Sequence, residues 1–210
     1  ISDESRELFP DGMGWTVKPL VMLHTPFQRT LYVDGDTIFC SDPLSEFAAV
    51  SAASIAFARE QRSEPAVTRN MKLSFNAGVI VYRKSQIVAV LMHDLTRILI
   101  NNMGKGDQEF WGQELSKFKL YSNLRYHYLK PRFHLQPCRN DKSSCFVDGP
   151  VVLAHGRCWL HTLGSEGVGE FCRKLNAVSA TRFISTDCKS LDVFELDDTK
   201  RNSPKLRRVE

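Results

Sequence analysis

The chain has 210 residues, of which 42% are apolar and 25% are charged, the balance of an ordinary globular domain with a sizeable core. Its net charge of +4 is modest and lies largely in the basic stretch 200–208, so composition predicts no nucleic-acid-binding face. No run of about 18 apolar residues is present, so the sequence predicts no membrane-spanning helix. We expect one domain over residues 1–195 and a basic, disordered tail over residues 196–210.

Apolar periodicity and turn residues predict strands that alternate with helices along the chain. The clearest helix is capped by Ser85, and its apolar residues recur at three- and four-residue steps. Such alternation predicts an α/β fold built on a mostly parallel or mixed sheet. In chain order, the predicted elements are a helix over 17–24 with Pro19 in its first turn, a strand over 31–39, a helix after Asp42, strands over 52–58 and 75–83, a helix from Ser85 to 101 or 102, a helix from Asp107, short strands over 120–129 and 133–135, a strand over 151–154, and a helix in the second half of 164–180.

Two carboxylates, Asp34 and Asp36, interrupt the strand predicted over residues 31–39. Two like charges beside a buried strand repel each other and lose hydration, which a bound cation would offset. Carboxylate oxygens suit Mn²⁺ or Mg²⁺, and Gly35 between the two acids allows a ligand to approach the backbone closely. The alternative is a tight turn, because Asp-Gly is also a strong hairpin signal.

Polar groups lie at three predicted strand ends: the pair Asp34 and Asp36, the segment 76–78, and His155. In open α/β sheets, ligands bind outside the carboxyl ends of the strands, so these groups can meet in one crevice. Two carboxylates and a neutral imidazole form a suitable ligand set for Mn²⁺. Each feature also has a simpler interpretation, with segment 76–78 as a bulge at a strand entrance and His155 as a packed histidine.

The six cysteines contain no C-x-x-C pair, so a structural zinc site is not expected. Cys138 and Cys145 flank a polar loop and can form a disulfide in an oxidising compartment. Equally, all six cysteines can be free thiols in a reducing compartment. The sequence therefore leaves the redox environment open.

Four segments, taken in order, resemble one family. They are Lys18 to Thr37, which ends in Leu-Tyr-Val-Asp-Gly-Asp-Thr, then Phe75 to Tyr82, the pair Asp107-Gln108, and His155-Gly156. Together they resemble the nucleotide-sugar glycosyltransferases of the GT-A fold, closest to the retaining glycogenin and bacterial galactosyltransferase group. The departures are Gly35, where that group more often has Ala, and Arg-Cys-Trp at 157–159, where Lys-Pro-Trp is common.

The resemblance implies a GT-A-like three-layer sandwich and a set of metal and donor contacts. Asp36 and His155 match direct metal ligands, and Asp34 matches a residue that contacts both the metal and the donor ribose. Lys18 matches a basic residue that approaches the donor diphosphate, although by itself it is as well explained as a solvated lysine. The stretch that lines the donor sugar corresponds to Asn76, Ala77 and Gly78.

The candidate catalytic residues are Asp107 and Gln108, which match the pair near the anomeric carbon or the acceptor. If the reaction inverts configuration, Asp107 is the first candidate for the base that deprotonates the acceptor hydroxyl. Its simpler role is the cap of the helix that it begins. Since only 17 residues precede Lys18, we expect the N-terminal strands that hold the nucleotide base to be lacking, and the chain to be part of a larger transferase.

The activity implied is a metal-dependent transfer of a sugar, with retention, from a nucleotide-diphosphate sugar to a hydroxyl group of a glycan, protein or small molecule. The metal implied is Mn²⁺ or Mg²⁺. The implied location is the Golgi lumen, with the cytoplasm as the alternative. Two other functions are open: a catalytically inactive carbohydrate- or partner-binding fragment on the same scaffold, and, less favoured, a Mg²⁺-dependent phosphohydrolase of the haloacid dehalogenase class, whose first strand also ends in Asp-x-Asp.

Overall fold

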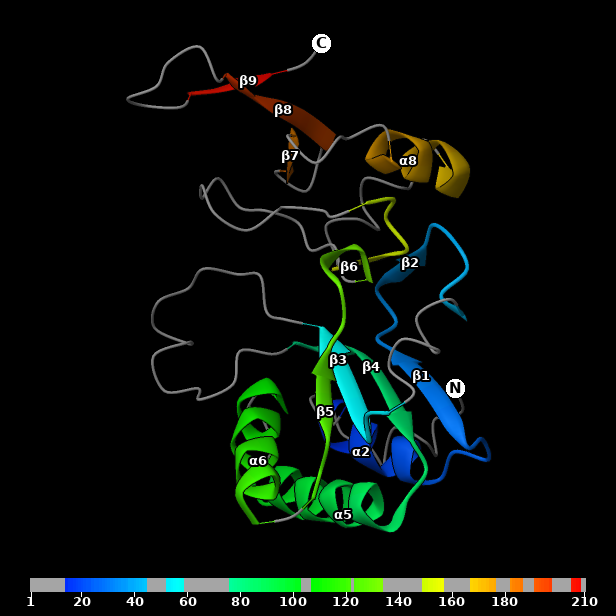
Figure 1. Ribbon diagram of the computed structural model, residues 1–210, viewed down its shortest axis with the longest axis vertical. Helices are drawn as coiled ribbons and strands as arrows, with labels where there is room; N and C mark the ends of the chain where they lie inside the picture. Colours follow the sequence, from blue (N-terminus) through cyan, green and yellow to red (C-terminus); the bar gives the residue numbers. More distant parts are fainter. Residues whose placement is uncertain are drawn as a thin grey trace, which may run out of the picture.

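The structure is a computed structural model that describes residues 14–44, 52–58, 76–102, 107–121, 123–133, 149–156, 167–176, 182–186, 191–197 and 205–208. Its elements, shown in Figure 1, are α2 (Gly14–Leu23), β1 (Arg29–Val33), β2 (Thr37–Phe39), β3 (Ile55–Ala58), β4 (Asn76–Arg83), α5 (Gln86–Ile100), α6 (Asp107–Tyr121), β5 (Tyr126–Tyr128), the 3₁₀ turn η1 (Pro131–Phe133), β6 (Leu153–His155), α8 (Gly167–Asn176), β7 (Arg182–Thr186), β8 (Leu191–Asp197) and β9 (Lys205–Arg208). No helix within these ranges combines the length and the apolar character needed to cross a membrane.

The main sheet has four strands in the order β1-β4-β3-β5. β4 pairs antiparallel with β1 and with β3, whereas β3 pairs parallel with β5. The predicted α/β class with a mixed sheet is therefore confirmed. Among the described strands, however, antiparallel pairings outnumber the parallel one, because side-chain periodicity reports which segments are strands and not the direction in which they pair.

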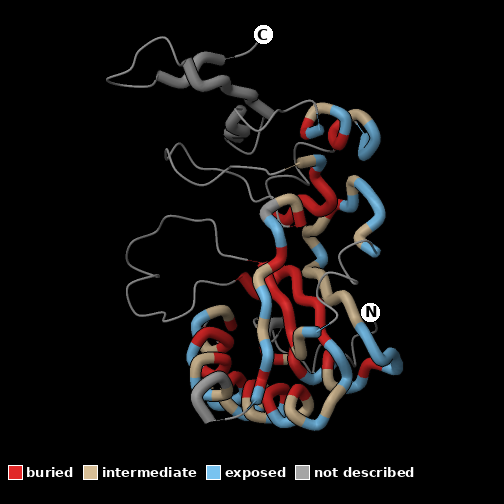
Figure 2. The backbone as a smooth tube through the Cα atoms, viewed as in Figure 1, coloured by how far each residue is buried: buried red, intermediate tan, exposed pale blue. Residues whose placement is uncertain are grey.

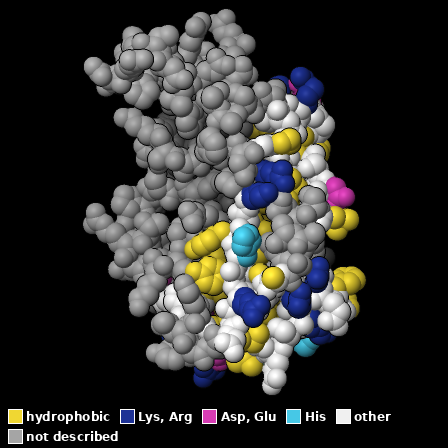
Figure 3. Space-filling view, in the orientation of Figure 1, with side chains coloured by type: hydrophobic (Ala, Val, Ile, Leu, Met, Phe, Trp, Pro, Cys, Tyr) yellow, Lys and Arg dark blue, Asp and Glu magenta, His cyan; other side chains and the backbone are white. Residues whose placement is uncertain are grey.

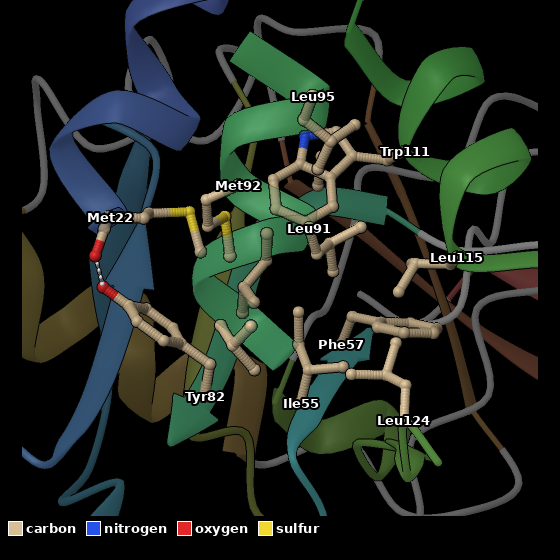
Figure 4. Packing of buried hydrophobic residues seen from close by; sticks show 13 residues of the cluster. Met22, Ile55, Phe57, Tyr82, Leu91, Met92, Leu95, Trp111, Leu115 and Leu124 are labelled. Carbon is tan, nitrogen blue, oxygen red and sulfur yellow. Dashed lines mark hydrogen bonds between the residues drawn. The ribbon is translucent and has the colours of Figure 1, made fainter. Parts of the chain in front are cut away.

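One face of this sheet packs against α2, α5 and α6. β4 is buried over seven of its eight residues, and alternate side chains face opposite sides, with Ile80 and Tyr82 on the helical side. Figure 4 shows the apolar side chains of the helices gathered around these strands, and Figure 2 shows the buried centre. The Tyr82 hydroxyl donates to the backbone oxygen of Met22 over 2.7 Å, which ties β4 to α2. Ser85 caps α5 as predicted, accepting from the Val88 N–H.

The other face of the sheet holds Val79 and Val81 and packs against η1 and the chain that leads into β6. Phe133 is 1% exposed, and Leu153 is fully buried there. The Val152 N–H donates to the backbone oxygen of Arg132 over 2.8 Å, joining the two segments. Within the described residues, the layer on this face is therefore made of the segment that leads into β6 and the short turn η1, without a helix.

The strand predicted over residues 31–39 is in fact two strands, β1 and β2, separated by a turn at residues 34–36. β1 belongs to the main sheet, whereas β2 pairs antiparallel with β6 in a second, two-stranded sheet. The alternative of an Asp-Gly turn is correct, but the turn closes no hairpin, since the two strands have different partners. Asp34 and Asp36 thus lie at the junction of two sheets.

Several predicted boundaries are wrong. α6 continues to Tyr121 and β5 covers only Tyr126–Tyr128, because the apolar helical period persists into the aromatic run predicted as a strand. Phe133 ends the turn η1 rather than beginning a strand, since Pro131 lacks the N–H that a strand ladder uses; residues 134 and 135 lie outside the described residues. α2 begins at Gly14, so Pro19 lies inside the helix and not in its first turn.

A disulfide joins Cys40, which follows β2, to Cys172 in α8. The alternative that all six cysteines are free thiols is therefore wrong. The candidate pair Cys138 and Cys145 lies outside the described residues. Sequence spacing gave no signal for the observed pair because its members are 132 residues apart. The Val151 N–H also donates to the side-chain oxygen of Asn176 over 2.6 Å, so α8 is attached to the residues that flank both strands of the small sheet.

The C-terminal region forms a three-stranded antiparallel sheet in the order β7-β8-β9. Part of the tail predicted to be disordered is therefore strand, because β9 pairs with the end of β8. The register places Glu195 opposite Arg207 and Asp197 opposite Lys205. The net charge of the tail does not report pairing with a strand elsewhere in the chain.

Candidate metal centre

Three chain segments meet where the two sheets join. Because β1 and β4 are antiparallel, the last residues of β1 lie beside the first residues of β4. The Asp34 N–H donates there to the Gly78 backbone oxygen over 2.9 Å. The β2–β6 register places Thr37 opposite His155, and the Gly156 N–H donates to the Asp36 oxygen over 3.0 Å. The predicted convergence is thus present, although antiparallel pairing produces it rather than a row of parallel strands.

Asp34, Asp36 and His155 form a group whose possible ligand atoms all lie within 4.8 Å of one another. His155 Nε2 is 3.1 Å from Asp36 Oδ1 and 3.7 Å from Asp34 Oδ2. The His155 side chain is 10% exposed, whereas those of Asp34 and Asp36 are 26% and 25% exposed, so the group opens to solvent on its carboxylate side. Two carboxylates and one imidazole fit Mn²⁺, and the carboxylates alone also suit Mg²⁺.

Lys18 places a buried ammonium beside this group. Its side chain is 3% exposed, and Nζ lies 3.0 Å from Asp34 Oδ1 and 2.9 Å from Asp107 Oδ2. Nζ also donates to the Ala77 backbone oxygen over 3.2 Å. The alternative of a solvated lysine is therefore wrong. Lys18 thus pairs with two carboxylates, Asp34 and Asp107, and the adjoining Asp36 adds a third negative charge to the cluster. This excess of negative charge favours a bound cation.

Asp107 and Gln108, the first residues of α6, contact the same group of residues. Asp107 is 7% exposed and meets Lys18 as an ion pair without the alignment of a hydrogen bond. Gln108 Oε1 accepts from Asn76 Nδ2 over 3.3 Å, and Asn76 Oδ1 accepts from the Gly78 N–H over 2.7 Å. The register between β3 and β4 also shifts beside this segment, between Phe57 and Ala58, so the strand entrance is irregular as well. All nine predicted site residues therefore lie in one connected cluster.

Tyr32 belongs to the cluster although sequence reasoning did not select it. Its hydroxyl donates to Asp34 Oδ1 over 3.0 Å, and Lys18 Nζ lies 5.5 Å from the centre of its ring. The sequence feature that could have selected Tyr32 is the two-residue period of a strand, which places the side chains of residues 32 and 34 on the same side. Burial, together with the nearby charge of Asp34, raises the pKa of Tyr32 well above its usual range.

This pKa shift predicts a loss of stability in alkali. Because the folded-state pKa of Tyr32 is raised, its stabilising contribution is fully present below about pH 10, the pKa of an unfolded tyrosine, and is lost as the pH rises further. In urea unfolding between about pH 8 and 11, Tyr32→Phe should show a shallower fall in unfolding free energy than the wild type. Tyr82, whose pKa burial also raises, contributes to the fall that remains in the variant. Equal slopes in wild type and variant would contradict the prediction.

Figure 3 shows one face of the molecule, on which the described Lys and Arg side chains are dispersed between apolar ones and gather into no single patch. The positive charge that the structure places directly against Asp34 is the buried ammonium of Lys18.

No protein-family model and no curated protein matches the sequence. Among solved structures, the chain is similar to mouse xyloside xylosyltransferase 1 in its apo form, with a TM-score of 0.48 and 18% identity over 69% of this chain and 64% of that chain. It is also similar to the glycosyltransferase GlyE of Streptococcus pneumoniae TIGR4, with a TM-score of 0.39 and 20% identity over 56% of this chain and 28% of that chain. The chain spans less than two thirds of the length of either structure.

Proposed function

We propose that this chain is the metal-binding part of a glycosyltransferase that moves a sugar, with retention, from a nucleotide-diphosphate sugar to a hydroxyl acceptor. The observation that carries the proposal is the meeting of Asp34, Asp36 and His155, with ligand atoms within 4.8 Å. These residues come from two sheets and from positions more than a hundred residues apart, and they are the ligands that the resemblance in sequence implies.

Asp36 and His155 would hold Mn²⁺ or Mg²⁺, with Asp34 as the third ligand. A divalent cation bound there stabilises the negative charge that grows on a departing nucleoside diphosphate. Lys18 adds a second positive charge and fixes the orientation of Asp34 through their ion pair. Its ammonium is engaged by protein groups on three sides, so we assign it to holding the carboxylates in place.

We assign Asp107 and Gln108 to the neighbourhood of the anomeric carbon. A carboxylate and an amide there orient the donor and support an oxocarbenium-like centre. The Asn76 amide fixes the Gln108 side chain from β4, and Lys18 fixes Asp107 from α2. Asp107 is buried and paired with a cation, which favours this orienting role over that of a base that deprotonates the acceptor.

We propose an oxidising compartment, the Golgi lumen, as the place where the protein works. The disulfide between Cys40 and Cys172 supports this location over the cytoplasm, since cytosolic thiols are kept reduced.

The test is the hydrolysis of a panel of nucleotide-diphosphate sugars by the full-length protein, with and without Mn²⁺. We expect metal-dependent donor hydrolysis that falls at least about 100-fold in Asp36→Asn, because a neutral amide binds the cation poorly. Asp94→Asn is the matched control, since Asp94 lies on α5 and forms an ion pair with the exposed Arg97, outside the metal centre.

Equal rates in the wild type and in Asp36→Asn would contradict the proposal. Release of phosphate from simple phosphate esters would identify a phosphohydrolase instead. Binding of glycans without Mn²⁺ and without donor hydrolysis would identify a binding module.

A further inference from the structure

The imidazole of His155 rests directly on the backbone of Gly78. A Cβ atom built at Gly78 would lie 2.1 Å from Cε1, 2.5 Å from Nε2 and 2.6 Å from Nδ1 of His155. Non-bonded carbon atoms pack at about 3.5 to 4.0 Å, so no side chain larger than hydrogen fits between β4 and this ring.

Glycine is needed at position 78 for space and not for backbone conformation. The described glycines with a positive φ are Gly149, Gly156 and Gly167, and Gly78 is not among them. Alanine could therefore adopt the Gly78 backbone without strain. Any effect of a methyl group at this position must arise from its contact with the imidazole.

Gly78 also fixes a second member of the metal centre. Its oxygen accepts from the Asp34 N–H over 2.9 Å, and its own N–H donates to Asn76 Oδ1 over 2.7 Å. One residue of β4 thus sets the backbone of one carboxylate and the ring position of the imidazole. Ligand groups must be held within about 0.5 Å of their productive geometry, so a ring displaced by a methyl group would leave the site poorly formed.

We propose that Gly78 is a positioning residue of the metal centre, whose missing side chain lets the His155 imidazole approach the two carboxylates. The proposal rests on the metal site of the proposed function. It gives the segment Asn76–Gly78 a role inside the protein, in addition to the contact with the donor sugar that the resemblance implies.

The first test measures Mn²⁺ affinity, by electron paramagnetic resonance of the free ion, in Gly78→Ala and in Gly169→Ala. Gly169 is the matched control, because it lies in α8, outside the metal centre, and a Cβ there meets nothing within 4 Å. We expect the dissociation constant for Mn²⁺ to rise at least about tenfold in Gly78→Ala, as for other residues that orient metal ligands. In Gly169→Ala it should stay within about twofold of the wild type. Equal affinities in the two variants would overturn the proposal.

The second test uses the metal-free protein, so it is independent of function. Gly78→Ala should lower the Tm by about 5 °C, since overpacking of this size is destabilising. In a His155→Ala background, most of that loss should disappear, because the ring that the methyl group displaces is gone. If the Tm losses of Gly78→Ala and His155→Ala simply add in the double variant, the proposed contact between position 78 and the His155 ring is wrong. A wild type that binds no Mn²⁺ would overturn both the metal role of Gly78 and the proposed function.

Discussion

Replacing Lys18 by methionine should lower the free energy of unfolding by about 3 kcal/mol, the cost of leaving buried carboxylates without their shared cation. The Lys18 side chain is 3% exposed and that of Asp107 is 9% exposed, so water cannot replace the lost ammonium. The value lies at the lower end of the range for buried pairs because Asp34 is 26% exposed and keeps part of its hydration. Methionine preserves most of the aliphatic volume, so the change isolates the charge.

Urea unfolding of Lys18→Met at neutral pH measures this loss. Arg97→Met is the control, since Arg97 is 74% exposed and its pair with Asp94 should contribute less than about 1 kcal/mol. A loss in Lys18→Met no larger than that in Arg97→Met would show that the carboxylates do not depend on the ammonium.

Removing the disulfide should lower the free energy of unfolding by a similar or larger amount. We expect the double variant Cys40→Ala with Cys172→Ala to lose about 4 kcal/mol of stability and about 10 °C in Tm, because the bond closes a long loop of 132 residues. Mn²⁺ affinity should fall as well, since the bond attaches α8 to the end of β2, and the β2–β6 pair carries Asp36 and His155 at its margin.

Thermal unfolding followed by circular dichroism gives the Tm of this double variant. Wild type treated with a reductant should show the same shift as the variant. An unchanged Tm in both would mean that the packing of α8 holds the small sheet without the bond.

The membership of the metal centre could be predicted from sequence because its residues interrupt or end apolar strands. Asp34, Asp36 and His155 stand out as polar groups next to buried runs, and Asp107 and Gln108 begin an amphipathic helix. Their convergence was expected at the carboxyl ends of parallel strands. It arises instead from antiparallel pairing of β1 with β4 and of β2 with β6, which single-sequence periodicity does not report.

Other features depended on contacts between distant residues. The Cys40–Cys172 bond joins positions that no local pattern relates, and the burial of Lys18 depends on α2 meeting the edge of β4 through the Ala77 oxygen. The strand β9 was missed because the tail was judged by its net charge, which does not report the pairing of β9 with β8. Tyr32, by contrast, could have been predicted from the sequence, because strand alternation places its side chain on the same side as that of residue 34.

The most direct measurement is a titration of the wild-type protein with Mn²⁺, followed by the electron paramagnetic resonance of the free ion. We expect one bound ion per chain, lost in both Asp36→Asn and His155→Ala and retained in His93→Ala, because His93 is an exposed residue of α5. No saturable binding by the wild type, or binding that survives both site variants, would contradict the metal centre formed by Asp34, Asp36 and His155.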